Sequence, residues 1–348
     1  MEFKCSTINV EEQPLSCSIS PASNQIAVGL INGELKVYSY IREEETSKIS
    51  SSLVGMFKSP TTKTASNDDS EEDDDDNDDG DRSSRGCRAV AFTPDGKSII
   101  CGFSDGSLYI LDSESLKPTF SSSSAHKTSL CHIFTFSFNV EGTGGAFFAS
   151  GDEKGVVHVW DLSSGLTKPY YSYVNHTDYI TDFALHAREN CLCVSSGDGT
   201  ISIHDLKARK VRARSEDDAD DELLSLKVMK KGRKVVCGTQ SGVLSIFSWG
   251  YFNDCSDRFP GHPESVQALA KFDEDTLLTG SIDGLIRIVS VLPNKLLGVV
   301  GEHDHGLPVE GLTLSGDRRI LASLGHDDVL RLWDVSCLHD DEDEAGGG

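Results

Sequence analysis

Histidine, serine, aspartate and tryptophan recur together in this chain, and His, Ser and Asp are the side chains of hydrolytic triads. The two sets are His303, Ser323, Asp327 and Trp333, and His126, Ser150 and Trp160. In the second set, Lys154 stands where the first set has its aspartate. A catalytic base must reach both its nucleophile and a substrate. Whether these residues catalyse a reaction or stabilise the fold therefore depends on the elements that carry them.

A turn pattern that recurs seven times identifies those elements. The residues at the seven turns are Gly33, Gly106, Gly155, Gly199, Gly242, Gly284 and Asp328. Successive turns are 73, 49, 44, 43, 42 and 44 residues apart. A repeat of roughly 40–45 residues with four short strands is typical of WD-repeat blades. We therefore predict an all-β chain that folds as a single seven-bladed WD-repeat β-propeller.

The predicted propeller spans residues 1–338 and has two irregularities. The first spacing is about 30 residues longer than a blade needs, because an acidic, Ser/Thr-rich insert occupies residues 59–86 after an expected outer strand at 53–57. Few residues follow the last Trp-Asp pair before an acidic, glycine-rich tail at 339–348. The last blade therefore lacks an outer strand, and we expect residues 3–10 to supply it. That pairing would close the ring and remove two exposed sheet edges.

The propeller changes how the His, Ser, Asp and Trp sets are interpreted. In a WD repeat these four side chains hydrogen-bond to one another inside the blade, since buried polar groups need partners. A hydroxyl inside a sheet is inaccessible to a substrate. We therefore predict a structural network, complete only in the last blade, and no catalytic residues. A propeller hydrolase is the remote alternative, and it would need convergent catalytic groups at the mouth of the central channel.

The sequence also predicts no cofactor, no metal and no contact with a membrane. Most of the eleven histidines occur one per blade, and the tightest cluster, residues 303–305, lacks a third spaced ligand. Neither a calcium-loop spacing nor a phosphate-binding glycine motif is present. No run approaches the ~18 apolar residues of a membrane span. The ten cysteines include no C-x-x-C pair, which indicates a reducing compartment.

The net charge of −24 is concentrated in three runs. Residues 68–81 contain eleven acids, residues 216–222 six, and residues 340–344 five. The remaining 34 acids and 32 bases nearly balance. Because like charges repel, we expect these runs to be disordered around a nearly neutral body.

Two basic runs, KARKVRAR and KVMKKGRK, form a candidate partner surface. We expect the first at the turn between the two outer strands of blade 4, and the second at the turn between the two inner strands of blade 5. These turns lie on one face of the ring, opposite the acidic loops at 68–81 and 216–222. The candidate residues are Lys207, Arg209, Lys210, Lys230, Lys231 and Arg233, with Trp249, Tyr251 and Phe252 beside them. Such a surface suits RNA or an acidic protein, and an ordinary solvated surface is the alternative.

Several segments resemble the WD repeat-containing protein 55 family. They are DELLSLKVMKKGRKVVCGTQSGVLSIFSWGYF at 221–252, SDRF at 256–259, TGSIDG at 279–284, LPNK at 292–295 and ILASLGHDDVLRLWDV at 320–335. CRAVAF at 87–92 and SGDGT at 196–200 also fit. The resemblance covers all seven blades and is weakest over residues 1–86 and 113–148. The acidic insert departs from the family, so no function is carried onto it.

The resemblance implies a non-enzymatic nuclear protein, chiefly nucleolar, that acts in ribosomal RNA processing and large-subunit assembly. We therefore expect a scaffold that works as a monomer within a complex. Its partners would be pre-ribosomal proteins, with pre-ribosomal RNA on the basic face and the cytoplasm as a further location. Plant members of the family are also linked to cullin ubiquitin ligases through the damaged-DNA-binding adaptor, so a ligase substrate receptor is the alternative. The WD-x-Arg box of such receptors lacks its arginine here, at both 160–163 (WDLS) and 333–336 (WDVS).

Overall fold

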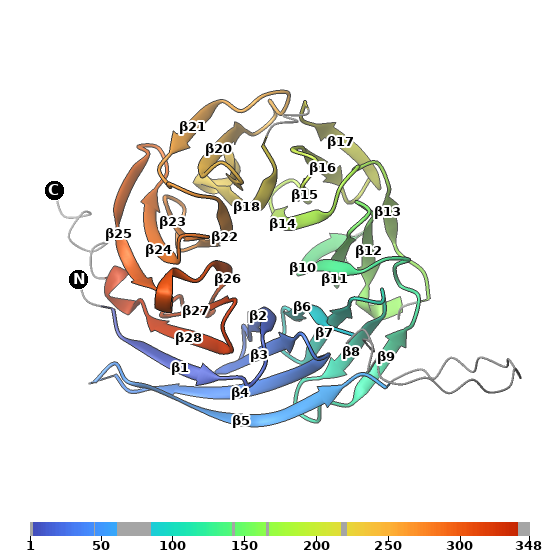
Figure 1. The fold of residues 1–348 in the computed structure, drawn as a ribbon. Helices are drawn as coiled ribbons and strands as arrows, with labels where there is room; N and C mark the ends of the chain where they lie inside the picture. The colour runs from blue at the N-terminus through green and yellow to red at the C-terminus, as the bar shows by residue number, and fades with distance from the viewer. Residues whose placement is uncertain are drawn as a thin grey trace, which may run out of the picture.

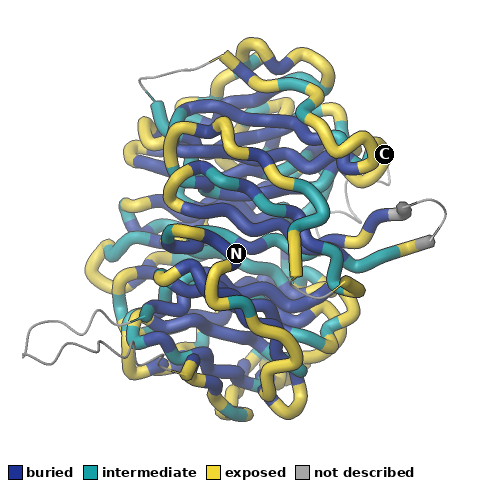
Figure 2. The backbone as a smooth tube through the Cα atoms, turned by 90° about the vertical axis from the view of Figure 1, so that its right-hand side faces the viewer, coloured by how far each residue is buried: buried dark blue, intermediate teal, exposed yellow. Residues whose placement is uncertain are grey.

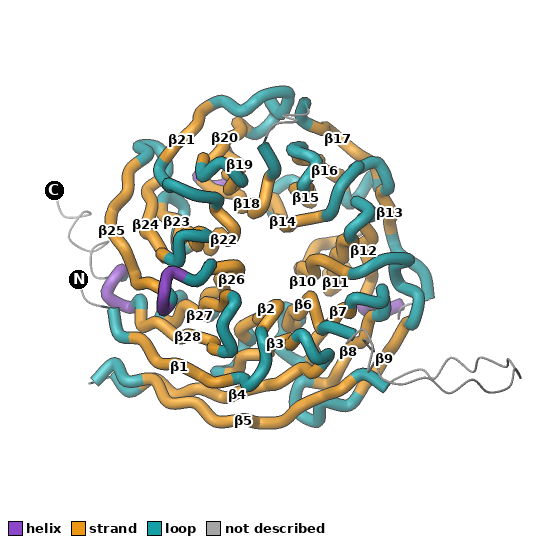
Figure 3. The backbone as a smooth tube through the Cα atoms, in the orientation of Figure 1, coloured by secondary structure: helices purple, strands orange, loops and turns teal. Residues whose placement is uncertain are grey.

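Seven four-stranded antiparallel sheets surround a central axis, which confirms the predicted seven-bladed β-propeller (Figure 1). The computed structural model describes residues 3–44, 46–60, 85–140, 143–164, 167–216 and 221–339. Within each blade the strands are called a to d, from the axis outward. Apart from four short 3-10 helices, loops and turns join the described strands (Figure 3).

The first three blades use consecutive strands. Blade 1 contains β2 (Pro14–Ile19), β3 (Gln25–Leu30), β4 (Glu34–Arg42) and β5 (Ile49–Lys58). Blade 2 contains β6 (Cys87–Phe92), β7 (Ser98–Phe103), β8 (Leu108–Asp112) and β9 (Pro118–Ser122). Blade 3 contains β10 (Leu130–Val140), β11 (Thr143–Asp152), β12 (Val157–Asp161) and β13 (Tyr171–Tyr173), with helix η1 (Leu162–Ser164) between the last two.

The remaining blades follow the same order, except the last. Blade 4 contains β14 (Ile180–His186), β15 (Cys191–Ser196), β16 (Ile201–Asp205) and β17 (Lys210–Arg214). Blade 5 contains β18 (Leu223–Met229), η2 (Lys230–Gly232), β19 (Lys234–Thr239), β20 (Val243–Ser248) and β21 (Asp257–Pro260). Blade 6 contains β22 (Val266–Lys271), β23 (Thr276–Ser281), β24 (Leu285–Ser290) and β25 (Lys295–Glu302). Blade 7 contains η3 (Asp304–Gly306), β26 (Val309–Leu314), β27 (Ile320–Gly325), β28 (Val329–Asp334) and η4 (Ser336–Leu338).

The N-terminal strand closes the ring, as predicted. Strand β1 (Cys5–Asn9) pairs antiparallel with β28, with Cys5 opposite Trp333 and Asn9 opposite Val329. Ile8 is buried in the apolar core that blades 7 and 1 share. The first and last segments of the described chain therefore lie side by side in one sheet (Figure 1).

The acidic insert follows the outer strand of blade 1. Strand β5 contains the outer strand predicted at 53–57, and the next strand along the chain is β6, the inner strand of blade 2. The insert is therefore a d–a connection, although residues 61–84 lie outside the described residues. Residues 217–220 and the tail at 340–348 also lie outside them, so the predictions of disorder remain untested.

The two middle strands of each blade are mostly buried, and exposed residues lie at the turns and on outer strands such as β5, β9 and β25 (Figure 2). Two turn glycines show how neighbouring blades fit together. Gly106 has φ +79°, and a Cβ there would lie 2.3 Å from the carbonyl oxygen of His126. Gly155 has φ +73°, and a Cβ there would lie 2.6 Å from the carbonyl oxygen of His176. Glycine tolerates this backbone angle and this close approach, so each turn fixes the histidine that precedes the next blade.

Candidate functional site

Blade 3 contains a complete chain of buried hydrogen bonds. Trp160 Nε1 donates to Ser150 Oγ over 2.9 Å, and Ser150 Oγ lies 2.7 Å from His126 Nε2. His126 Nδ1 lies 2.9 Å from a carboxylate oxygen of Asp152. The expectation that Lys154 leaves this blade without its carboxylate is wrong. Asp152 also accepts the Lys154 backbone N–H, so one carboxylate both shapes the turn and holds the histidine.

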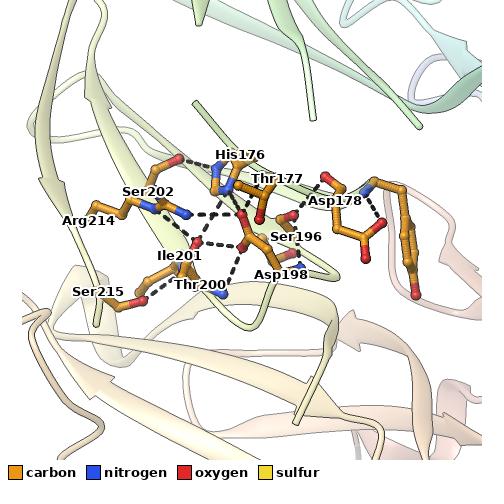
Figure 4. A network of polar contacts seen from close by, with 12 residues as sticks. His176, Thr177, Asp178, Ser196, Asp198, Thr200, Ile201, Ser202, Arg214 and Ser215 are labelled. Carbon is orange, nitrogen blue, oxygen red and sulfur yellow. Dashed lines mark hydrogen bonds and ion pairs between the residues drawn. The ribbon is translucent and has the colours of Figure 1, made fainter. Parts of the chain in front are cut away.

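Blade 4 contains a second complete network that the sequence analysis missed (Figure 4). His176 Nδ1 lies 2.9 Å from Asp198 Oδ2, and its Nε2 lies 2.7 Å from Ser202 Oγ. Ser202 is on strand c rather than strand b. His204 takes the place of tryptophan, with its Nε2 2.7 Å from Ser202 Oγ. Arg214 of strand d adds an ion pair to Asp198 at 3.1 Å.

The electrostatics of this network follow from burial and hydrogen bonding. Burial alone would raise the pKa of Asp198, but hydrogen bonds from His176 and Thr200 outweigh it and hold the pKa below its usual range. Burial lowers the pKa of His204 to about 3, so this imidazole is neutral at physiological pH.

Blade 7 contains the predicted histidine, serine and tryptophan, but its aspartate has a different partner. His303 Nε2 lies 2.8 Å from Ser323 Oγ, which accepts a hydrogen bond from Trp333 Nε1 over 2.9 Å. Asp327 instead pairs with Arg331 at 2.5 Å, and Arg331 Nη1 lies 3.2 Å from His303 Nδ1. The prediction that only this blade has the complete network is therefore wrong, because blades 3 and 4 hold the carboxylate against the histidine.

These networks cannot act as hydrolytic sites. Ser323 and His303 are fully buried, as are Ser150 and Ser202, so no substrate can reach the hydroxyls. Each network instead joins strands of one blade to the histidine that precedes it.

The central channel, about 590 Å³ in volume, is the place where a catalytic cluster would have to lie. Asp182 there pairs with Lys227 at 2.6 Å and with His132 at 3.3 Å. Asp182 also accepts the Leu226 backbone N–H over 2.9 Å, so its carboxylate ties blade 4 to blade 5. Burial raises the pKa of the neighbouring Cys131 to about 12, which keeps this thiol protonated and a poor nucleophile.

The basic turns of blades 4 and 5 lie on one face of the ring. Lys207 and Arg209 lie in the c–d connection of blade 4, and Lys210 begins β17. Lys231 and Arg233 belong to the a–b turn of blade 5. All five side chains are exposed.

Three of the predicted cations already make contacts within the protein. Arg233 Nε donates to the Lys230 carbonyl over 3.1 Å. Lys230 Nζ pairs with Asp275 at 2.6 Å and donates to the Leu292 carbonyl, so it belongs to the joint between blades 5 and 6. The Arg209 guanidinium lies 3.9 Å from the centroid of the Tyr170 ring in blade 3.

The three predicted aromatic residues have different environments. Tyr251 is 79% exposed in the c–d connection of blade 5, where its backbone N–H donates to the Ser248 carbonyl. Trp249 is half-buried, because it stacks on His186 at 3.8 Å between ring centroids and donates to Glu189 over 2.7 Å. Phe252 is only 4% exposed and packs in the core between blades 4 and 5. Its assignment to the partner surface is therefore wrong, because the turn folds this ring inward.

No group of three or more metal-ligating side chains occurs among the described residues. The described part of the chain also has no helix long and apolar enough to cross a membrane.

The comparison with known proteins matches this architecture. A family model described as WDR55 matches residues 61–338. The chain belongs to the WDR55 family. WD repeat-containing protein 55 of Arabidopsis thaliana is 38% identical over 90% of this chain and 78% of its own length. WD repeat-containing protein JIP5 of Malassezia globosa is 35% identical (92% and 78%), and WD repeat-containing protein 55 of Homo sapiens is 34% identical (94% and 76%).

Membership of the WDR55 family agrees with the WD-repeat propeller, while the names of its members state no activity. Strand c of blade 7 ends at the WDVS segment considered above, where Arg42 of blade 1 fills the space beside the box. Arg42 Nε pairs with Asp334 Oδ2 at 2.7 Å, and Arg42 Nη2 donates to Ser336 Oγ over 2.7 Å.

Proposed function

We propose that this chain is a non-catalytic interaction scaffold in nucleolar ribosome biogenesis, in ribosomal RNA processing and large-subunit assembly. The proposal places it in the nucleus and nucleolus, bound as a monomer to proteins of pre-ribosomal particles. Membership of the WDR55 family supports this assignment.

The observation that carries the proposal is a closed ring with exposed cations on one face. Lys207, Lys210 and Lys231 form no ion pair with a described carboxylate, and hydrogen-bonded turns hold them. A surface fixed before binding loses little conformational entropy when a partner binds. Unpaired cations also favour a polyanionic partner and raise its rate of association.

The test is affinity purification of the tagged protein from nuclear extract, with and without ribonuclease, followed by mass spectrometry. We expect large-subunit assembly factors and pre-ribosomal RNA to be recovered. Recovery of a cullin-ligase adaptor without ribosomal material would instead make the chain a ligase receptor and contradict the proposal.

A charge-reversed variant tests the surface itself. Changing Lys207, Lys210, Lys231 and Arg233 to Glu should release the protein from pre-ribosomal particles while its melting temperature stays within a few degrees of the wild type. Unchanged co-sedimentation of the folded variant would exclude the basic face from the interaction.

A further inference from the structure

The cationic surface extends beyond the two runs visible in the sequence. Lys168, in the c–d connection of blade 3, and Arg188, in the a–b turn of blade 4, are exposed on the same face. Neither side chain forms an ion pair with a described carboxylate. The same holds for Lys207, Lys210, Lys231 and Arg233 of blades 4 and 5. The cationic track consists of Lys168, Arg188, Lys207, Lys210, Lys231 and Arg233.

Two flat groups accompany the cationic track. The Arg209 guanidinium rests on the Tyr170 ring at 3.9 Å and is itself exposed. Tyr251 projects from a turn in which Gly250 has φ +89°, and 79% of its surface is accessible. One planar group therefore lies at the joint between blades 3 and 4, and the other lies on blade 5.

The turn that carries Tyr251 is fixed to its surroundings. The Trp249 backbone N–H donates to the Arg233 carbonyl over 2.9 Å, which joins this turn to the one carrying Lys231. The Trp249 ring stacks on His186 of blade 4. The ring of Tyr251 is therefore presented on an ordered turn, which reduces the entropy lost when it stacks on a ligand.

We propose that this face of blades 3 to 5 binds single-stranded RNA, with phosphates along the cationic track and bases stacked on Tyr251 and on Arg209. This inference rests on the proposed function and names the partner of its surface. Phosphates pair with lysine and arginine without regard to sequence. Unpaired bases stack on aromatic rings and on guanidinium planes. An acidic peptide would satisfy the cations but not the two flat groups, and a duplex keeps its bases stacked inside.

The first test separates the phosphate contacts from the stacking contacts by their salt dependence. The probe is a fluorescent single-stranded RNA of mixed sequence, titrated with the full chain at several salt concentrations. Each lost phosphate contact lowers the slope of log affinity against log salt by about 0.7 for a single strand. The double variant Lys207→Gln, Lys231→Gln should therefore bind with a slope smaller by about 1.4. The matched control is Lys97→Gln, Lys117→Gln on the blade 2 turns of the same face, and it should leave the slope unchanged.

Tyr251→Ala should change the affinity for RNA but not its salt dependence. Loss of one stacked base should weaken RNA binding about tenfold or more while the salt slope stays unchanged. Tyr251→Phe keeps the ring and should keep the affinity. Since Tyr251 is 79% exposed, thermal melting should be the same for both variants and the wild type.

Two further probes decide between classes of partner. Polyglutamate and duplex RNA of equal charge should each bind more weakly than the single strand and should be insensitive to Tyr251→Ala. Polyglutamate that binds as tightly as RNA, together with an unaffected Tyr251→Ala variant, would overturn the proposal in favour of an acidic protein.

This test is separable from that of the proposed function. Wild-type protein that enters pre-ribosomal particles but fails to bind RNA overturns the inference and leaves the scaffold role in place. Protein that binds RNA in this manner but recovers no ribosomal material keeps the inference and removes the scaffold role.

Discussion

Blades 4 and 7 place an aspartate at the same turn position but give it different partners. Asp198, directly before the turn glycine of blade 4, hydrogen-bonds to His176 at 2.9 Å. Asp327, directly before the equivalent turn residue of blade 7, pairs with Arg331 and not with His303. The cause is the residue three positions after the turn, which is Ser202 in blade 4 and an arginine in blade 7. A guanidinium competes successfully for the carboxylate because its hydrogen bonds are charge-assisted.

The aspartate of blade 6 pairs with an arginine, as in blade 7, and that of blade 3 contacts the histidine, as in blade 4. Asp283 pairs with Arg287 at 2.6 Å, and no described group satisfies His262 Nδ1. In blade 3 the carboxylate of Asp152 reaches His126 from a different turn position. The propeller therefore repeats the backbone more faithfully than the chemistry of its polar networks.

The difference in partners also dictates which nitrogen carries the proton. In blade 4 the carboxylate accepts from His176 Nδ1, so the Nδ1–H form is required when the ring is neutral. In blade 7 the Arg331 guanidinium donates toward His303 Nδ1, so the proton must lie on Nε2, facing Ser323. The networks of blades 4 and 7 thus hold opposite histidine tautomers.

The largest loss of stability should come from removing the Asp198 carboxylate of blade 4. Asp198→Ala leaves His176, Thr200 and Arg214 without their shared acceptor. Hydrogen bonds to a charged group contribute about 1.5–3 kcal/mol each, so losing the two from His176 and Thr200 should cost about 3–5 kcal/mol. The measurement is the free energy of unfolding from urea titration. Asp161→Ala is the matched control, because its carboxylate only caps a turn at Ser163, and it should cost about 1 kcal/mol. Equal losses in the two variants would contradict the importance of the blade 4 network.

The features of the fold that depend on the spacing of residues along the chain can be predicted from the sequence. Turn intervals predict the number of blades, and the few residues after the last Trp-Asp pair predict the closing strand, because strand length and turn chemistry are local properties. The carboxylate of Asp152 was missed because it lies three residues before the turn glycine rather than one. The role of Arg331 depends on competition between side chains of neighbouring strands, and burial of Phe252 depends on how a whole turn folds. Both are decided by tertiary packing.

Acid should destabilise the arginine-containing blades. Burial, reinforced by Arg287 and Arg331, lowers the pKa of both His262 and His303 to about 4, against 6.5 in the unfolded chain. The unfolded state therefore binds protons first. Stability is full above about pH 6.5 and falls toward pH 4, by about 2–3 kcal/mol for each histidine.

The measurement is the free energy of unfolding between pH 7.5 and 4.5, compared with that of His303→Gln. The variant should be less stable at pH 7.5, yet it should lose less stability on acidification. If the free energy of unfolding varies with pH in the same way for both proteins, the pKa of His303 is the same in the folded and unfolded states.

Removing the carboxylate of blade 7 should cost less than removing that of blade 4. Arg331 keeps a second partner, Asp304, at 3.0 Å, and one oxygen of Asp327 has no described hydrogen-bond partner. We expect Asp327→Ala to lower the free energy of unfolding by about 1–2 kcal/mol, near the value of ordinary charged hydrogen bonds. A loss as large as that of Asp198→Ala would mean that the two networks are equivalent despite their different partners.

The last prediction has the smallest expected effect and concerns the position of the proton on the His303 imidazole. Arg331→Ser gives blade 7 the side chain that blade 4 has at this position, so Asp327 loses its guanidinium partner and becomes available to His303. We expect His303 to change from the Nε2–H to the Nδ1–H form and its pKa to rise above 4, because a carboxylate replaces a cation beside it. Nitrogen-15 NMR of the imidazoles reads both quantities directly, with His176 in the same spectra as the Nδ1–H reference. If His303 in the folded variant keeps its proton on Nε2, the arginine does not determine the tautomer, and the packing around Ser323 must do so.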